Sequence, residues 1–263
     1  MSGEVLGDVL VECRKVSVGY SDVPVLKDID LTIKRGEIVA LLGGSGCGKS
    51  TLLRCITGLL PPLSGEVLLL GKPLYELSVD DRNLLLRHTG TAFQQDALFG
   101  SMSVDENVGL ALRELTNLPE PVIREMVRMK LALVNMSGVE AREPASLSGG
   151  QRKRIALARA SILDPEIIFC DEPSAGLDPI VAAGIDETLL KFRDALGISL
   201  VVVTHELESI KAIADRAIMF ARGGIVAQGT IAELSESQDE AVYNFFHRVA
   251  PGHEHADTQA SAR

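Results

Sequence analysis

The chain has 263 residues, of which 46% are hydrophobic and 24% charged, with a formal net charge of −10. This composition suits a globular protein with a substantial core, and the acidic balance argues against a general nucleic-acid binder, which would present a basic surface. The four cysteines show no metal-ligand spacing, so we expect reduced thiols. The sequence has no signal-peptide pattern and no apolar run near the ~18 residues of a membrane span. We therefore expect a cytoplasmic protein that meets a membrane only through a partner.

The first part of the chain reads as strands followed by one helix. Residues 9–20 and 25–33 alternate apolar and polar side chains, which predicts half-buried strands. Residues 38–42 are apolar throughout, which suits a central strand buried on both faces. A helix over 49–60, ended by the two prolines that follow, and a short strand over 66–70 complete this part.

The middle of the chain is mostly helical. A strand is expected over 89–94, and most of residues 101–162 then read as helix. Pro121 suits the first turn of one of these helices. We therefore expect a helical subdomain inserted at about residues 95–162. Two capping-box candidates mark helix starts, Ser78 with Asp81 and Ser103 with Glu106.

The α/β alternation then resumes. Asp178 and Pro179 are suited to the N-cap and first position of a helix that runs to about residue 195. The other elements expected are strands over 166–170 and 198–203, a helix near 206–214, a hairpin over 217–229 that turns at Gly223-Gly224, and a last helix over 239–249. Residues 251–263 have no apolar pattern and are expected to be loose.

A glycine-rich stretch, GGSGCGKS, runs from Gly43 to Ser50 and fits the pattern G-x-x-x-x-G-K-[ST] between a buried strand and a helix. Glycines let consecutive backbone N–H groups converge on an anion, and the helix N-terminus adds partial positive charge. Lys49 can then reach the β- and γ-phosphates of a nucleotide, and the Ser50 hydroxyl suits Mg²⁺. The alternative, a plain glycine turn, leaves the lysine and serine unexplained.

Two acids end the apolar strand IIFCDE at residues 167–172. Ligands of open α/β sheets bind at the carboxyl ends of the strands. Asp171 is therefore a candidate to hold Mg²⁺, and Glu172 is a candidate to accept a proton from an attacking water or to orient it. The alternative is a strand end that meets solvent.

A second phosphate-binding element starts the stretch LSGGQRKRIALARA, residues 147–160. Ser148, Gly149 and Gly150 expose backbone N–H groups at a helix start. The alternative is an ordinary helix start, with a solvated basic face formed by Arg152, Lys153 and Arg154. The chain thus has two candidate phosphate-binding elements but one candidate Mg²⁺ site, and the sequence does not say whether the two elements act on the same nucleotide.

The motifs GGSGCGKST, LSGGQ, FCDEP, SAGLD and VVVTHE occur in the order typical of ATP-binding cassette (ABC) ATPases. The chain resembles this family over roughly residues 9–235. The resemblance implies an α/β P-loop NTPase fold with a RecA-like core, an antiparallel β subdomain and the helical subdomain, forming an ATPase domain over 1–235 with a tail over 236–263. It also implies a head-to-tail homodimer, in which the P-loop of one subunit and the LSGGQ of the other enclose each ATP.

The resemblance also assigns roles to single positions. It implies that Tyr20 stacks on adenine, that Gln94 reaches Mg²⁺ and the water, and that His205 contacts the γ-phosphate. The alternatives are a core or edge-strand tyrosine, a one-residue slip to Gln95, and a structural histidine. Asp178, which ends SAGLD, would communicate across the dimer in addition to capping its helix.

The expected site residues divide into three groups. The catalytic group is Lys49, Gln94, Glu172 and His205. The ATP-binding group is Tyr20, Gly43, Gly44, Ser45, Gly46, Cys47, Gly48, Lys49, Ser50, Thr51, Ser148, Gly149, Gly150, Gln151 and Asp178. The Mg²⁺ group is Ser50, Gln94 and Asp171.

A narrower resemblance lies outside these motifs. Residues 93–119 and 240–249 are similar to the ATPases of Mla-type phospholipid transport systems, relatives of the Mce importers. This implies an ATPase subunit bound to the cytoplasmic face of the inner membrane that drives lipid transport through an integral membrane permease. An Mce-type (MlaD-like) lipid-binding protein and a small STAS-type subunit are further implied partners, and nucleic acid is not. The glutamine of LSGGQ departs from some close relatives, which carry another residue there.

Three points stay open at the sequence level. An apolar face of the tail helix, formed by Val242, Phe245, Phe246 and Val249, would pack across the partner ATPase or, alternatively, on its own domain. A transporter of small polar solutes is the main alternative function. A non-transport ABC ATPase is disfavoured by the single cassette, and a non-enzymatic scaffold by the presence of Lys49 and Glu172.

Overall fold

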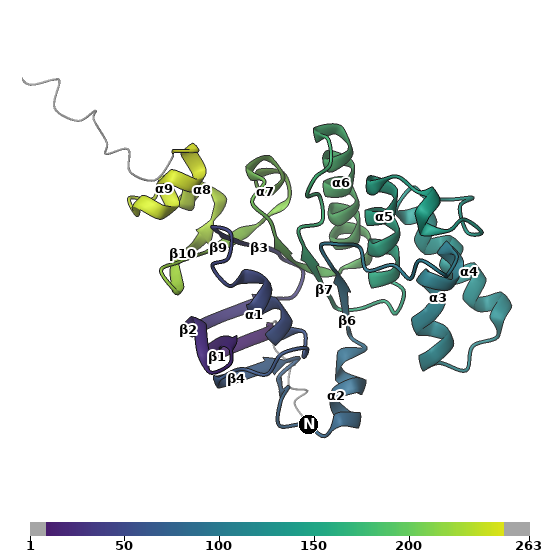
Figure 1. Ribbon diagram of the computed structural model, residues 1–263, viewed down its shortest axis with the longest axis horizontal. Helices are drawn as coiled ribbons and strands as arrows, with labels where there is room; N and C mark the ends of the chain where they lie inside the picture. Colours follow the sequence, from purple (N-terminus) through teal and green to yellow (C-terminus); the bar gives the residue numbers. More distant parts are fainter. Residues whose placement is uncertain (1–8, 250–263) are drawn as a thin grey trace, which may run out of the picture.

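The computed structural model describes residues 9–249, whose strands form two sheets (Figure 1). A four-stranded antiparallel sheet has the order β2-β1-β4-β5, and a six-stranded sheet has the order β10-β9-β3-β8-β7-β6. In the larger sheet all neighbours pair in parallel except the edge strand β10, which is antiparallel to β9. The strands are β1 (Val9–Tyr20), β2 (Val23–Lys34), β3 (Ile38–Gly43), β4 (Ser64–Leu69), β5 (Lys72–Pro73), β6 (Thr89–Ala92), β7 (Ile167–Asp171), β8 (Ser199–Val203), β9 (Arg216–Ala221) and β10 (Gly224–Thr230).

Helices cover both faces of the larger sheet and extend beyond its two ends (Figure 1). The helices are α1 (Lys49–Ile56), α2 (Val79–Leu86), α3 (Val104–Leu115), α4 (Glu120–Leu133), the 3₁₀ turn η1 (Pro144–Ser146), α5 (Gly149–Ala160), α6 (Pro179–Leu196), α7 (Leu207–Ile213), α8 (Ile231–Ser235) and α9 (Glu240–His247). The mixed α/β fold expected from the sequence is confirmed. Of the helices within residues 9–249, none has both the length and the hydropathy to cross a bilayer.

The central strands separate two apolar cores. Val39 and Leu41 of β3 share a buried cluster with α1 and the antiparallel sheet. Helices α5 and α6 lie on the opposite face, in a cluster that includes Ile38 and the alternate residues of β7 and β8. Side chains of a strand point alternately to its two faces, so a fully apolar strand serves both cores. As a result, the helix after the P-loop and the helix after LSGGQ cover opposite sides of the sheet.

Local sequence signals set most element ends, although several depart from expectation: β6 ends at Ala92 instead of residue 94, and α9 ends at His247 instead of residue 249. The predicted capping box of Ser103 and Glu106 forms at the start of α3. The predicted box of Ser78 and Asp81 forms only in part, because Ser78 accepts from the Asp81 N–H while the Asp81 carboxylate accepts from the Ser78 hydroxyl instead of its N–H. Helix α1, expected to run to residue 60, ends at Ile56, because Gly58 takes a left-handed conformation with φ of 79° and donates to the Cys55 carbonyl.

The C-terminal hairpin turns one residue earlier than expected. Arg222 and Gly223 form its two-residue loop, with φ values of 52° and 78°. Positive φ at both loop positions gives the backbone twist that matches flanking antiparallel strands. Gly224 is instead the first residue of β10 and pairs with Ala221.

Helix α9 packs on its own chain. Val242 is fully buried and Phe246 is 6% exposed, in one cluster with Leu42 of β3 and Met219 of β9. An ion pair of 2.7 Å between Asp239 and the hairpin residue Arg222 adds a polar contact at the start of the helix. Of the two alternatives left open for this face, packing on its own domain holds for Val242 and Phe246, because both are buried in the chain's own core. The expected loose segment 251–263 lies outside the described residues.

Substitution of Phe246 by alanine tests the docking of α9. Removal of a buried aromatic ring leaves a cavity and lowers the free energy of unfolding by about 3 kcal/mol. The measurement is urea unfolding of the purified chain, with Met129→Ala on the exposed surface of α4 as a control that shifts it by less than about 0.5 kcal/mol. Equal stability of the two variants would show that α9 is not docked in solution.

Candidate functional site

The P-loop joins the carboxyl end of β3 to the N-terminus of α1. Gly48 caps the helix with φ of 105°, a left-handed conformation that disfavours side chains. A Cβ on Gly43 would lie 2.4 Å from the Phe220 carbonyl oxygen, so the loop packs directly against β9. Residues 44–46 of the loop are exposed. The expected loop therefore forms, with its tip open to solvent beside a helix N-terminus.

Lys49 lies across the loop and is only 8% exposed. Its ammonium donates to the carbonyl oxygens of Gly43, at 2.7 Å, and Gly44, at 3.0 Å. These acceptors compensate for the burial of the charge. The ammonium is thus held beside the exposed tip of the loop, within the segment where phosphate is expected.

Ser50 and Asp171 meet, although 121 positions separate them in the chain. The Ser50 hydroxyl donates to Asp171 Oδ1 at 3.1 Å. Burial raises the pKa of the Asp171 carboxyl, and the hydrogen bond from Ser50 and the charges of Arg54 and Lys49 oppose that rise. The loop serine and the strand-end carboxylate therefore share one site.

Glu172 and His205 also form a pair. Glu172 Oε1 lies 2.8 Å from Nδ1 of His205, whose side chain is 65% exposed. Glu172 Oε2 is buried and accepts no hydrogen bond from residues 9–249, so its capacity to accept one is unused. The structure thus brings two of the expected catalytic side chains together at adjacent strand ends.

Two cavities adjoin the P-loop. One of about 240 Å³ is lined by Tyr20, Val25 and the P-loop residues Gly46, Gly48, Lys49, Ser50 and Thr51. Tyr20 is 47% exposed and accepts a hydrogen bond of 2.8 Å from Arg54, so it is not a core residue. A second cavity of about 320 Å³ contains Ser50 and Asp171 together with both Gln94 and Gln95, so both glutamines remain candidates.

The LSGGQ segment begins α5. Ser148 is the N-cap, and its capping box with Gln151 closes in both directions, at 3.3 Å and 3.0 Å. A Cβ on Gly150 would lie 2.4 Å from Val181 Cγ1, so the turn packs tightly on α6. Asp178 caps α6 by accepting from two backbone N–H groups, which is the structural role expected for it.

The LSGGQ turn and the P-loop remain apart within the chain. Their helices, α5 and α1, belong to clusters on opposite faces of the sheet. Neither cavity at the P-loop contains a residue of the LSGGQ turn. The sequence-predicted site residues therefore form two groups, with Ser148, Gly149, Gly150, Gln151 and Asp178 in the second.

One residue beside the site was missed from the sequence. Lys153 is 8% exposed, and its ammonium donates to the backbone carbonyls of Gln94 and Glu172. A solvated basic face at residues 152–154 is therefore wrong for Lys153. A usable signal was its helical spacing, because it falls on the buried stripe of α5 with Gly150, Leu157 and Ala160.

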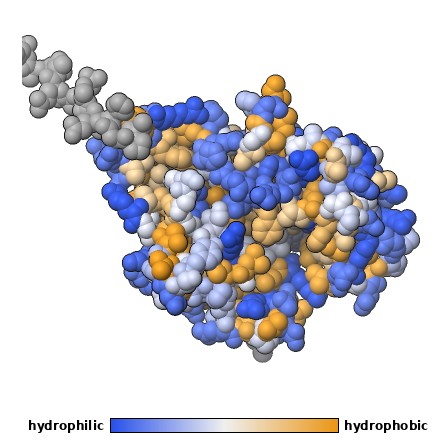
Figure 2. Space-filling model, viewed as in Figure 1, coloured by the Kyte–Doolittle hydropathy of each residue, from blue (hydrophilic) through white to orange (hydrophobic). Residues whose placement is uncertain are grey.

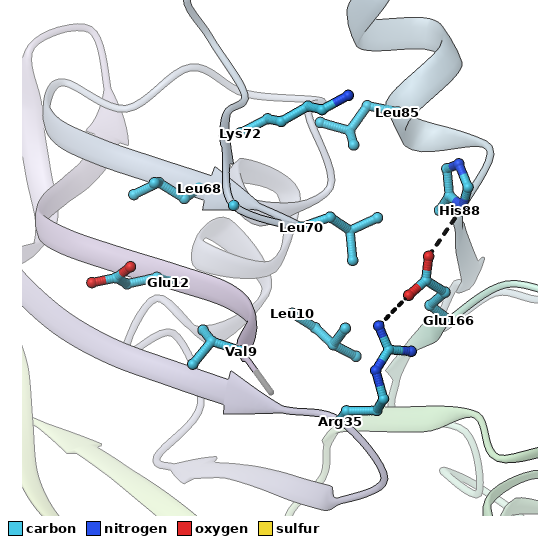
Figure 3. A pocket seen from close by; sticks show the side chains of 11 residues that line it. Val9, Leu10, Glu12, Arg35, Leu68, Leu70, Lys72, Leu85, His88 and Glu166 are labelled. Atoms are coloured by element: carbon cyan, nitrogen blue, oxygen red, sulfur yellow. Dashed lines mark hydrogen bonds and ion pairs between the residues drawn. The ribbon is translucent and has the colours of Figure 1, made fainter. Parts of the chain in front are cut away.

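A further cavity of about 400 Å³ lies away from both groups. Figure 3 shows it between the antiparallel sheet and α2, with leucine side chains on one side and Glu166 between His88 and Arg35 on the other. None of its lining residues belongs to the P-loop or the LSGGQ turn. It is therefore separate from the candidate site.

Comparisons of sequence and of structure both match this chain to ABC transporter proteins. The family described as ABC transporter matches residues 26–175. The Haemophilus influenzae intermembrane phospholipid transport system ATP-binding protein MlaF is 39% identical over 243 residues, covering 92% of each chain. The chloroplastic protein TRIGALACTOSYLDIACYLGLYCEROL 3 of Arabidopsis thaliana is 41% identical over 254 residues, covering 90% of this chain and 73% of that one. A solved dimer of the ATP-binding cassette MJ0796 bound to ADP and Pi matches with TM-score 0.77 and 30% identity, over 84% of this chain and 98% of that one.

The glycine at position 48 can be tested directly. In Gly48→Ala the new Cβ would lie 2.7 Å from Leu26 Cγ at a φ that costs an L-residue about 1–2 kcal/mol. We expect the free energy of unfolding to fall by at least that amount in chemical denaturation without nucleotide. Gly44→Ala is the matched control, since a Cβ there meets nothing within 4 Å. Equal stabilities would show that the loop does not adopt this conformation.

Proposed function

The chain belongs to the ABC transporter family and hydrolyses ATP, and from this premise we propose that it is the ATPase subunit of a membrane transporter of phospholipid. The support for a phospholipid substrate is whole-chain similarity to a relative whose name specifies that activity. The observation that supports the catalytic assignment is the Glu172–His205 pair at the strand ends next to the P-loop. The residue roles that follow are part of this proposal.

The nucleotide is proposed to lie along the P-loop. The backbone N–H groups of Gly43–Thr51 would hold its phosphates, and Lys49 would exchange its loop carbonyls for phosphate oxygens. Tyr20 lines the same cavity with an exposed ring, which supports stacking on adenine. Cys47 would contribute through its backbone.

We propose that Mg²⁺ accompanies ATP at Ser50, Asp171 and Gln94. The three line one cavity and offer only oxygen ligands, which a hard divalent cation prefers, so the residues fit the ion. When bound, Mg²⁺ would neutralise charge on the β- and γ-phosphates.

Glu172 is proposed to accept a proton from the attacking water at its free oxygen Oε2. That oxygen is buried and has no hydrogen-bond partner among the described residues, while the other oxygen is held by His205. The pairing fixes the direction of the carboxylate, as a general base requires. His205 is then placed to contact the γ-phosphate, with Lys49 as a further positive charge on it.

A homodimer would complete each pocket. The LSGGQ turn is a phosphate-binding helix start, yet it shares no cavity with the chain's own P-loop. Head-to-tail association would place the turn of the partner subunit on the γ-phosphate and bring Asp178 to the interface. ATP would then bridge the two subunits until hydrolysis released them.

The permease is proposed to dock beside the Gln94 loop. Phe93, Phe99 and Leu59 are large apolar residues that are 39%, 50% and 61% exposed, and Phe93 lines the cavity with Gln94. Figure 2 shows apolar residues gathered around a hollow in the middle of one face of the molecule. Nucleotide-driven closure of the dimer would thereby move the permease.

The protein would lie on the cytoplasmic face of the inner membrane, bound to the permease and associated with an Mce-type lipid-binding protein and a STAS-type subunit rather than nucleic acid. The division into an ATPase domain over 1–235, with its helical insertion at about 95–162, and a tail over 236–263 also remains a proposal.

Substitution of the proposed general base is the first functional test. Glu172→Gln removes the proton acceptor, so kcat for phosphate release should fall by roughly 10²–10⁴-fold. ATP binding should persist, and ATP-bound dimer should accumulate on size exclusion. Glu166→Gln, which alters the opposite end of the same strand region, is the control and should retain turnover. Normal hydrolysis by the Glu172 variant would refute its assigned role.

The transport proposal is tested by purifying the chain with its membrane complex and analysing bound lipids. A permease carrying phospholipid, whose occupancy changes when ATP is added, is the expected result. A permease without lipid whose vesicles take up a small polar solute on ATP addition would instead favour the alternative class of substrate.

A further inference from the structure

A buried ammonium connects three segments of the catalytic region. Lys153 Nζ lies 2.9 Å from the Gln94 carbonyl oxygen, 3.3 Å from that of Glu172 and 3.5 Å from Asp96 Oδ1. Because a buried charge must be compensated, these contacts are not interchangeable with solvent. One side chain of α5 thus holds the loop after β6 and the residue after β7.

The backbone of Glu172 needs such support. Its φ is 52°, a left-handed conformation that is unfavourable for a residue with a Cβ and persists only where the surroundings impose it. On one side its N–H donates to the Val203 carbonyl at 2.8 Å. On the other side its carbonyl accepts from Lys153. Loss of the second contact would free the peptide that directs the carboxylate.

Lys153 also lies close to the LSGGQ turn. It follows Gly150 by three residues, within the first turns of α5, whose start is fixed by the reciprocal cap of Ser148 and Gln151. Gly150 packs against Val181 with no room for a Cβ. A shift of the turn would therefore move Lys153 with it.

We propose that Lys153 is a positioning residue for ATP hydrolysis, which holds the strained backbone of Glu172 and the Gln94 loop in register with the LSGGQ turn. This inference rests on the proposed roles of those segments. When the LSGGQ turn engages the nucleotide bound to the partner subunit, Lys153 keeps Glu172, the proposed general base of its own subunit, in position. The same ammonium would then tie the binding of one nucleotide to the hydrolysis of the other.

The simpler role of neutralising Asp96 accounts for less of the geometry. Both hydrogen bonds of Lys153 go to backbone carbonyls, and Asp96 Oδ1 accepts none. Asp96 also lies 3.5 Å from Arg152 Nε, so a second cation is available to it. Neutralisation of Asp96 and positioning of Glu172 predict different activities when the charges of Lys153 and Asp96 are both removed.

The test compares Asp96→Asn with the double variant Lys153→Met and Asp96→Asn in the full chain. The double variant leaves no unpaired carboxylate at position 96, so the cost to stability is limited to the carbonyls of Gln94 and Glu172, which lose their donor. We expect its kcat to be about 10²-fold below that of Asp96→Asn, the cost of displacing a catalytic group by about 1 Å. The KM for ATP, trinitrophenyl-ATP binding and ATP-driven dimer formation should not change.

Each other outcome overturns the proposal. A kcat equal to that of Asp96→Asn would reduce Lys153 to charge neutralisation. Unfolding of the double variant at the assay temperature, weaker nucleotide binding or loss of dimer formation would assign it to folding or binding. Lys191→Met, which removes an exposed lysine from α6, is the control for loss of a positive charge. If the unaltered chain does not hydrolyse ATP, the proposed function itself fails. That outcome is distinct from a failure of the inference about Lys153, which requires an active unaltered chain.

Discussion

The site depends on the parallel pairing of β3, β8 and β7. Leu41 of β3 and Asp171 of β7 both pair with Val203, the last residue of β8. Parallel strands end at the same edge of a sheet, so the segments that follow them leave from one line. The P-loop, Glu172 and His205 are neighbours for this reason, although His205 follows Gly43, the first residue of the loop, by 162 positions (205 − 43). The proposed contacts of Lys49, Ser50, Asp171, Glu172 and His205 start from that line, whereas Tyr20 comes from β1 of the antiparallel sheet.

Much of this arrangement could be predicted from the sequence, because its causes are local. The fully apolar strands, the glycine pattern of the P-loop and the cap residues Ser103 and Asp178 specify their own conformations through a few neighbouring atoms. The order of the motifs then indicated the family. Gly58 is a local signal for the end of α1 as well, and it acts before the two prolines that follow it.

The remaining features depend on long-range packing. Nothing in the spacing of the tail helix distinguishes a face that meets a partner from one that meets its own sheet, so the burial of Val242 and Phe246 required the fold. The role of Lys153 was hidden for a related reason, since its acceptors lie 59 and 19 positions away. Three consecutive basic residues read as a solvent-exposed helix face until the segments that pack over the lysine are known.

Lys49 and Lys153, the two buried lysines of the catalytic region, both donate to backbone carbonyls but have different roles. Lys49 bonds to carbonyls of an exposed, glycine-rich loop, and arriving phosphate oxygens can replace them. Lys153 joins the carbonyls of two separate segments, those of Gln94 and Glu172, which lie 59 and 19 positions away from it in the chain. One ammonium is therefore available for exchange, while the other is part of the scaffold.

The position of α9 bears on how shortened forms of the protein should be interpreted. Val242 and Phe246 lie in one cluster with Leu42, the residue immediately before the P-loop. Trimming the chain ahead of Glu240 would uncover the reverse side of the strand that carries that loop. Lost activity in such a truncated form would reflect damage to the nucleotide pocket from behind, and would say little about which proteins the C-terminus recruits.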